Sequence, residues 1–213
     1  MRGAVLAGGG ATRFGGRPKG LELVGGERIL DRLVRTFTDA LGEPPLLVAN
    51  DPAAAGWHPG LRVSADVRPG LGALGGILTA VAVAPAPVVC VAWDMPFVTT
   101  ALVRTLAAGL TGADVSIPAS DGRRGLEPLC AAYGPACGAA IERTVAAGDV
   151  RAIGFHQAVR VHIIPLEDVR PLGDPAELFF NVNTADELAA AEEIWRTRAS
   201  SRSSDARTPE RPR

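Results

Sequence analysis

The residues best suited to chemistry lie in a glycine-rich loop that runs from Leu6 to Lys19 and reads LAGGGATRFGGRPK. Consecutive glycines allow several backbone N–H groups to turn toward one anion, and Arg13 and Lys19 add positive charge. Two familiar phosphate motifs do not fit, because G-x-G-x-x-G needs glycine at position 13 and the P-loop pattern needs lysine at position 16. We expect a phosphate-binding loop of another type, with a flexible surface loop as the alternative.

Lys19 is the only lysine among the 22 lysine and arginine residues of the chain. A lysine ammonium is a compact point charge, and a planar guanidinium does not replace it freely at a crowded phosphate. We therefore expect Lys19 to neutralise phosphate charge. A solvated surface lysine is the alternative.

Asp94 follows the most apolar stretch of the chain, residues 88–93, which reads VVCVAW. Such a run is typical of a central parallel strand, and an unpaired carboxylate at its end is costly unless it meets a cation or backbone donors. Magnesium is commonly held by one or two carboxylates together with phosphate oxygens and water. We therefore expect Asp94 to bind Mg²⁺. Capping of a helix that begins near Thr99 is the alternative.

Strands and helices alternate along the chain, as short apolar runs and helical spacing of apolar residues indicate. The predicted strands cover residues 2–6, 46–49, 61–64, 88–93, 113–118, 129–133 and 159–165. The predicted helices cover residues 27–41, 77–84, 100–110, 135–148 and 185–195. Thr184 and Glu187 form a capping box for the last helix. This order predicts an α/β fold with three α-β-α layers and a mostly parallel twisted sheet.

Four polar or small residues lie at or just past the ends of predicted strands, namely Ala7, Asn50, Asp66 and Asp94. In parallel sheets, ligands bind beyond the carboxyl ends of the strands. We therefore expect these four residues to converge on one crevice. Taken alone, Asn50 and Asp66 could equally be ordinary turn residues.

Length and composition fit one globular domain, with 213 residues, of which 47% are hydrophobic and 21% charged. We assign residues 1–196 to this domain and residues 197–213, rich in Ser, Arg and Pro, to a disordered tail. The net charge of −1 lacks the basic signature of proteins that bind nucleic acid or membranes.

Histidines and cysteines give no sign of a metal or nucleophilic site. His58, His156 and His162 lack ligand spacing, and we interpret them as structural or surface residues. The three cysteines also lack metal spacing and fit reduced packing residues. Because neither a signal peptide nor a membrane span is visible in the sequence, we expect a cytoplasmic enzyme.

Five segments resemble, in order, the motifs of the molybdenum cofactor guanylyltransferases, which belong to a wider family of Rossmann-like nucleotidyltransferases. The first is the glycine-rich loop itself, with LAGG, Arg-Phe-Gly and the lysine in the family's order. The others are GLGALGGI at 70–77, DMPF at 94–97, EPL at 127–129 and FNVNTADEL at 180–188. The second segment departs from the family in having Ala73 where proline is usual. The loop marks the wider family, and the last segment indicates the guanylyl branch.

The resemblance implies a role for each candidate site residue. Lys19, Arg13 and Asp94 would be catalytic, with Mg²⁺ on Asp94. Asn181, Asn183 and Arg151 would bind the molybdopterin substrate, although the asparagines alone could be turn residues and the arginine a surface cation. The implied nucleotide-binding residues are Leu6, Ala7, Gly8, Gly9, Gly10, Arg13, Lys19, Asn50, Asp66, Gly72, Gly75 and Asp94.

The implied reaction moves GMP from GTP to molybdenum-molybdopterin and releases pyrophosphate. The attacking phosphate is already anionic near neutral pH, so no strong general base is needed. A cytidylyl or other nucleotidyltransferase of the same family is one alternative, and a non-catalytic nucleotide-binding module is another. We also expect a transient contact with a protein that delivers or accepts the cofactor, and neither nucleic acid nor membrane as a partner.

Overall fold

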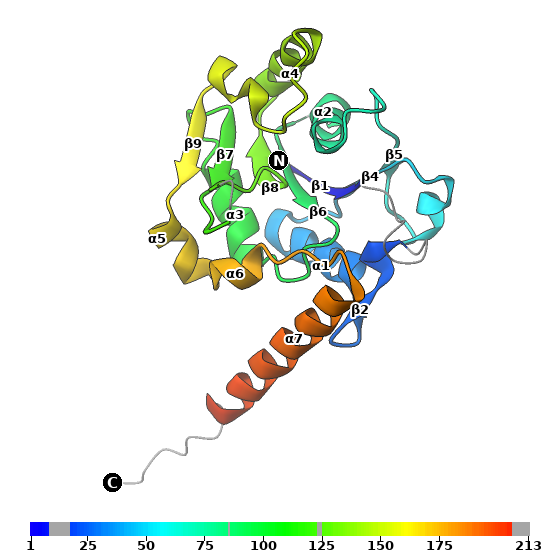
Figure 1. The fold of residues 1–213 in the computed structure, drawn as a ribbon, viewed down its shortest axis with the longest axis vertical. Coiled ribbons are helices and arrows are strands. Elements are labelled where there is room, and N and C mark those ends of the chain that lie inside the picture. The colour runs from blue at the N-terminus through cyan, green and yellow to red at the C-terminus, as the bar shows by residue number, and fades with distance from the viewer. Residues whose placement is uncertain (9–17, 85, 123–124, 206–213) are drawn as a thin grey trace.

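The computed structural model describes residues 1–8, 18–84, 86–122 and 125–205, which form an α/β fold (Figure 1). The main sheet has the strand order β5-β4-β1-β6-β8-β7-β9. Its strands are β1 (Arg2–Ala7), β4 (Leu46–Ala49), β5 (Val63–Ser64), β6 (Val88–Ala92), β7 (Val115–Pro118), β8 (Cys130–Tyr133) and β9 (Val161–Ile164). Strand β8 runs antiparallel to both neighbours, whereas the other pairs are parallel. The prediction of a mostly parallel sheet is confirmed.

Helices cover both faces of the sheet. They are α1 (Ile29–Leu41), α2 (Ala73–Val83), α3 (Thr100–Ala108), α4 (Ala136–Ala146), α5 (Leu166–Val169), α6 (Pro175–Leu178) and α7 (Ala185–Asp205). Short 3₁₀ turns add η2 (Lys19–Leu21), η3 (Pro52–Gly56), η4 (Gly154–Ala158) and η5 (Arg170–Leu172). Figure 1 shows α1 and α3 on one side of the sheet and α2 and α4 on the other, which confirms the three layers.

Two apolar cores explain these layers. Side chains alternate between the faces of a strand, so Val5 joins the core under α1 and α3, whereas Ala4 and Leu6 join the core under α2 and α4. All five residues of β6 are buried, because helices cover both of its faces. The carboxyl end of β6 is therefore held rigidly at the middle of the sheet.

Helix α1 begins at Ile29 rather than at residue 27, because Glu27 and Arg28 form a short strand instead. This strand, β3 (Glu27–Arg28), pairs with β2 (Leu23–Val24) in an antiparallel hairpin. Gly25 and Gly26 form the turn with φ of 61° and 77°, values that favour glycine and that tight hairpins require.

Helix α2 begins at Ala73, inside the segment that the sequence analysis assigned to a glycine loop ahead of a helix at 77. The backbone N–H groups of Gly75 and Gly76 both donate to the carbonyl of Gly72, at 3.1 and 3.3 Å. Gly72 itself has a φ of 56°, and it therefore supplies the turn from which the helix starts.

Helix α7 continues to Asp205, whereas the sequence analysis ended it at Trp195 and placed the start of a tail at 197. Contacts made beyond the expected end explain the difference. Arg198 Nε donates to Glu177 Oε2 at 2.6 Å, and its guanidinium lies 4.7 Å from the centre of the Phe97 ring. The rest of the predicted tail, residues 206–213, lies outside the described residues.

Among the described helices, none combines the length and the apolar character that crossing a membrane requires. Helix α7 is the longest of them, and it carries charged residues along its length.

Candidate active site

A cavity of about 700 Å³ opens where β1, β4 and β6 end. As the strand order predicted, Ala7, Asn50, Asp66 and Asp94 line this one cavity. Its full lining is Leu6, Ala7, Gly8, Val48, Asn50, Asp66, Gly70, Gly72, Ala73, Gly76, Ala92, Trp93, Asp94, Leu129, Asn181 and Asn183. Sequence positions from 6 to 183 therefore meet at the carboxyl edge of the parallel strands.

The glycine-rich loop enters the cavity through Leu6, Ala7 and Gly8. Three residues predicted to bind phosphate, Gly9, Gly10 and Arg13, lie outside the described residues. The phosphate-binding roles of all seven implied loop residues, Lys19 included, stay predictions.

Lys19 contacts the cavity wall through Asn183. The lysine lies in η2 and is only 7% exposed, and its Nζ donates a hydrogen bond to Asn183 Oδ1 at 2.7 Å. The alternative of a solvated surface lysine is wrong. An ammonium carries three N–H donors, so this contact leaves it able to bind phosphate oxygens as well.

Asp94 follows β6 as a carboxylate without a full set of partners. Its Oδ1 atom is buried and has no hydrogen-bond partner among the described residues. Burial raises the pKa of Asp94, and the nearby charge of Lys19 opposes part of this increase. A desolvated carboxylate oxygen in a polar cavity fits a hard divalent cation, which meets carboxylate oxygen preferentially.

The alternative that Asp94 caps a helix is wrong. Helix α3 begins with Thr99 as its cap, and the Thr99 hydroxyl accepts a hydrogen bond from the Leu102 N–H at 3.2 Å. Asp94 is therefore free of a capping role.

Asn50 and Asp66 bind each other across the ends of neighbouring strands. The Asn50 side-chain amide donates to Asp66 Oδ2 at 2.7 Å, and the Asp66 N–H donates to Asn50 Oδ1 at 2.8 Å. Thr79 of α2 accepts from the Val67 N–H at 3.0 Å and fixes the same turn. The two residues thus form one polar wall of the cavity rather than two separate turns.

The amino end of α2 faces the cavity through Gly70, Gly72 and Ala73. Unsatisfied backbone N–H groups and the helix dipole favour an anion at such an end. Gly75 does not line the cavity but packs behind it, since a Cβ there would lie 3.2 Å from Leu71 Cβ and 3.5 Å from Asp66 Oδ2.

Asn181 and Asn183 reach the cavity from the segment that precedes α7. The Val182 N–H between them donates to the Asp94 carbonyl at 2.9 Å, which ties this segment to the end of β6. The Asn181 amide donates to the Phe179 carbonyl at 2.8 Å, as expected for a turn residue. One half of the predicted capping box is confirmed, since Glu187 N donates to Thr184 Oγ1. In the other half, Glu187 Oε2 accepts from the N–H of Asn183, one residue before Thr184.

The structure does not bring Arg151 into the same cavity. Arg151 pairs with Asp149 at 2.7 Å between Nη2 and Oδ2 and lines an adjoining cavity of about 460 Å³. The two cavities share Ala73 as a lining residue. A substrate contact of Arg151 stays a prediction.

Trp93 was not among the predicted site residues, because it was interpreted only as part of the apolar strand. Trp93 lines the cavity, stacks on Trp57 with ring centres 5.1 Å apart, and lies under Gly20, where a Cβ would approach its ring to 2.6 Å. The Trp57 carbonyl accepts from Arg28 Nη1 at 3.0 Å, and Arg28 also pairs with Asp31 at the start of α1.

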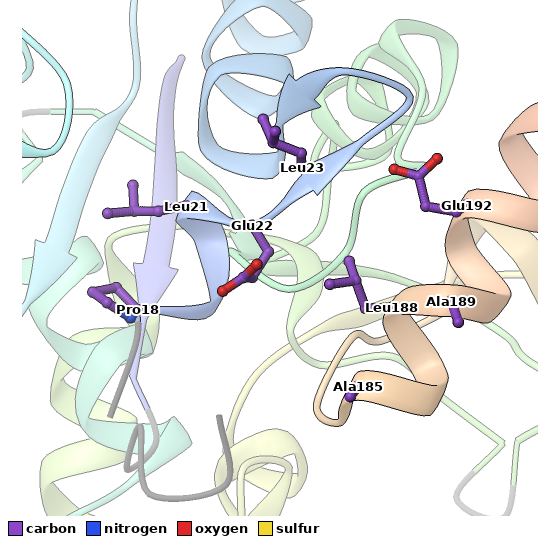
Figure 2. A pocket seen from close by; sticks show the side chains of 8 residues that line it. All are labelled: Pro18, Leu21, Glu22, Leu23, Ala185, Leu188, Ala189 and Glu192. Atoms are coloured by element: carbon purple, nitrogen blue, oxygen red, sulfur yellow. The ribbon is translucent and has the colours of Figure 1, made fainter. Parts of the chain in front are cut away.

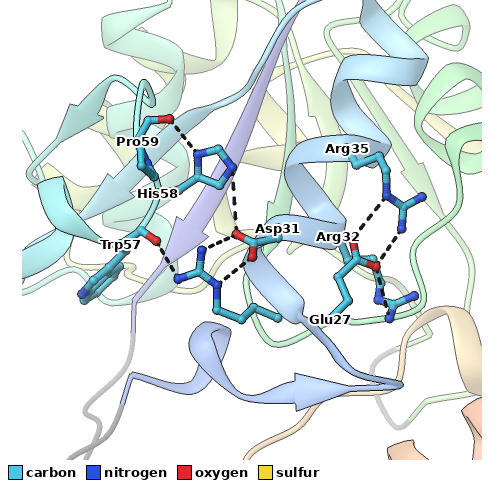
Figure 3. Close-up of polar contacts among 8 residues, drawn as sticks. Glu27, Asp31, Arg32, Arg35, Trp57, His58 and Pro59 are labelled. Atoms are coloured by element: carbon cyan, nitrogen blue, oxygen red, sulfur yellow. Dashed lines mark hydrogen bonds and ion pairs between the residues drawn. The ribbon is translucent and has the colours of Figure 1, made fainter.

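The histidines contribute nothing to this cavity, since none of the three lines it. His58 instead contacts the Pro59 carbonyl at 2.9 Å and lies 3.9 Å from Asp31 (Figure 3). All three cysteines are buried and free. These outcomes agree with the structural interpretation from the sequence.

Comparison with known proteins gives consistent matches. The family model described as "MobA-like NTP transferase domain" matches residues 3–161. A probable molybdenum cofactor guanylyltransferase of Pelotomaculum thermopropionicum is 36% identical over 192 residues, which cover 89% of this chain and 90% of the relative. A molybdenum cofactor guanylyltransferase of Desulfosudis oleivorans is 32% identical over 195 residues, which cover 90% of this chain and 94% of the relative.

Solved structures share the fold. Molybdopterin-guanine dinucleotide biosynthesis protein A from Archaeoglobus fulgidus superposes with a TM-score of 0.77 at 27% identity and covers 92% of this chain and 100% of its own. A nucleotidyl transferase from Methanothermobacter thermautotroptrophicus has a TM-score of 0.67 at 20% identity, over 92% of this chain and 98% of its own, and supports the fold alone.

Proposed function

Because the chain belongs to the MobA-like NTP transferase family, and within it to the molybdenum cofactor guanylyltransferases, we propose that this nucleotidyltransferase transfers GMP from GTP to molybdenum-molybdopterin. An oxygen of the terminal phosphate of molybdopterin attacks the α-phosphorus of GTP. The new P–O bond forms as the bond from the α-phosphorus to the bridging oxygen breaks, and pyrophosphate leaves with that bond's electron pair. The products are the guanine dinucleotide cofactor and pyrophosphate.

The observation that carries the proposal is that Asp94 and Asn183 line one cavity and that the buried Lys19 contacts it through Asn183. The lysine is bonded to Asn183, the Asp94 carboxylate is largely desolvated, and the amino end of α2 faces the same space. The main obstacle to this reaction is the crowding of negative charge on the phosphates. A buried ammonium and a helix amino end both act on that charge in a site that is partly shielded from water.

Asp94 would hold Mg²⁺, which supplies neutralisation of phosphate charge and orientation of the leaving group when it is bound. The orphaned Oδ1 atom supports this assignment. Within the described residues no cluster of three or more His, Cys, Asp or Glu side chains is present. Mg²⁺ bound to Asp94 would therefore take most of its other ligands from phosphate oxygens and water.

The two asparagines and the Asn50–Asp66 pair divide the cavity between the substrates. We assign the nucleoside of GTP to the Asn50–Asp66 wall and the pterin to the side of the cavity that carries Asn181 and Asn183. Side-chain amides can both donate and accept, which suits a pterin edge and a purine edge alike. The cytoplasmic location and the contact with a protein that delivers or accepts the cofactor stay predictions.

The test is identification of the product. The protein is incubated with Mg²⁺, molybdenum cofactor and each of GTP, CTP, ATP and UTP, and the dinucleotide is identified by mass while pyrophosphate release is followed. We expect the guanine dinucleotide, with pyrophosphate released only when both substrates are present. A cytosine dinucleotide would establish the cytidylyl alternative, and binding of nucleotide without any release would establish a non-catalytic module.

A further inference from the structure

Among the described residues, the Lys19 ammonium donates a hydrogen bond to Asn183, which lies far along the chain. Lys19 Nζ and Asn183 Oδ1 lie 2.7 Å apart although 164 positions separate the two residues. The lysine is 7% exposed, so water contributes little to fixing its position. A long, flexible side chain that is buried without a fixed acceptor would sample several positions.

Asn183 is itself held from two directions. Its backbone N–H donates to Glu187 Oε2 at 2.7 Å, within the first turn of α7. The preceding residue, Val182, is fully buried and donates its N–H to the Asp94 carbonyl at 2.9 Å. The acceptor for Lys19 is thus anchored both to the final helix and to the residue that would bind the metal.

The β2–β3 hairpin, which follows the turn that carries Lys19, also packs against α7. Gly25 N donates to Glu192 Oε1 at 3.0 Å, and a Cβ on Gly25 would lie 2.1 Å from Trp195 Nε1. Arg32 lies 4.0 Å from the centre of the Trp195 ring and donates to the Val24 carbonyl at 2.6 Å. Figure 2 shows Pro18, Leu21 and Leu23 on one side of a groove and Leu188 and Glu192 of α7 on the other.

We propose that Asn183 is a positioning residue that holds the Lys19 ammonium in place beside Asp94, with the first turn of α7 as its support. This inference rests on the proposed function, in which Lys19 neutralises phosphate charge. It differs from the role that the family resemblance implies for Asn183, which is a direct contact with the pterin. The family model ends at residue 161, so Asn183 lies outside the part of the chain that it matches.

The single lysine provides a readout that needs no substrate. In protein labelled with ¹⁵N at the lysine Nζ, Lys19 gives the one side-chain ammonium signal, and that signal is sharp only while proton exchange with water is slow. We expect a sharp signal from the full-length wild-type protein and from Asn183→Asp, which keeps an oxygen acceptor. Asn183→Leu should lose or shift the signal, because the acceptor is gone.

Asn181→Leu is the matched control. Asn181 lines the same cavity but donates to the Phe179 carbonyl, so its replacement should leave the ammonium signal unchanged. An exchange-broadened signal in the wild-type protein, or an unchanged signal in Asn183→Leu, overturns the proposal. Both results stand whether or not the chain transfers GMP, so they separate this inference from the proposed function.

Steady-state kinetics give the second readout. We expect Asn183→Leu to lower kcat by roughly 10²-fold, the loss typical of a misplaced group, with small changes in KM, and Asn183→Asp to restore most of it. A rise in KM for molybdenum-molybdopterin at unchanged kcat, with an unchanged ammonium signal, would show that Asn183 touches the substrate directly and does not position the lysine.

Discussion

At the scale of single residues, the Asp94 carboxylate that would bind the metal also lowers the stability of the metal-free protein, because it is buried without a full set of partners. Its buried Oδ1 lacks a partner among the described residues, and burial raises the pKa of the carboxyl above its usual value of 3.8. A carboxylate with a raised pKa in the folded state is ionised at a cost to stability. That cost is absent below about pH 3.8, where the group is protonated in both states, and it is complete above the folded-state pKa.

We therefore predict that Asp94→Asn abolishes turnover yet stabilises the metal-free protein at neutral pH. A gain on the order of 1 kcal/mol corresponds to roughly 2–4 °C in Tm for a chain of this length. The gain should disappear as the pH falls below about 3.8. Thermal unfolding of both proteins at several pH values, in the presence of a chelator, measures it. A lower Tm for the variant at neutral pH would show that the carboxylate is already well compensated.

Lys19 gives the second prediction at this scale. The buried site holds a compact ammonium against Asn183, so the larger guanidinium of Lys19→Arg should be displaced despite its equal charge. We expect kcat to fall by roughly 10²-fold while the fold is retained. The reverse change at an exposed ion pair, Arg160→Lys beside Asp114, serves as the control and should leave kcat unchanged. Equal activity of Lys19→Arg and wild type would remove Lys19 from the phosphate site.

At the scale of elements, the hairpin β2–β3 depends on α7 through one glycine. Gly25 and Gly26 both have positive φ, but a Cβ at Gly25 would collide with Trp195, whereas a Cβ at Gly26 has nothing within 4 Å. Alanine should cost roughly 1–2 kcal/mol at either position for the backbone alone. Gly25→Ala should cost roughly 1–3 kcal/mol more because it overpacks the contact. Urea unfolding of the two variants gives the difference, and equal midpoints would contradict it.

The sequence predicted the long elements well and the short ones poorly. Strand 46–49 and the core of α1 were recognised because their apolar residues follow the period of the element. The hairpin was missed because strands of two residues carry no period, although the Gly25-Gly26 pair was a usable turn signal. Helix α7 is longer than predicted because Arg198 packs on the Phe97 ring and supports the later turns, and the local sequence pattern does not show this contact.

The site was predictable to the extent that strand ends determine it. Ala7, Asn50, Asp66 and Asp94 converge because parallel strands end at one edge. The bond between Lys19 and Asn183 and the stack of Trp93 on Trp57 depend on how distant segments return to that edge. The position of Arg151 was also not predictable from strand ends, since the segment after α4 places it in the adjoining cavity.

At the scale of the whole molecule, the cavity is lined at one end of the chain by residues of β1 and at the other by the segment that α7 supports. We predict that a chain ending after Ala190, which loses Glu192, Trp195 and Arg198, has a lower Tm and a lower kcat than the full chain. A chain ending after Ser200 keeps all of these contacts and should match the full chain in both measurements. Similar loss in the two truncated chains would instead assign a role to the final residues.

The antiparallel direction of β8 determines where this chain can accept extra residues beside the cavity. Because β8 runs against its neighbours, it offers the cavity its beginning and not its end, and the Leu129 carbonyl accepts from the Ala92 N–H at 2.8 Å. Leu129, the residue before β8, therefore lines the cavity, whereas Asp121 and Gly122, earlier in the same connection, are exposed. Residues inserted at Asp121 and Gly122 would lengthen the connection that ends at the cavity without changing the register of any strand.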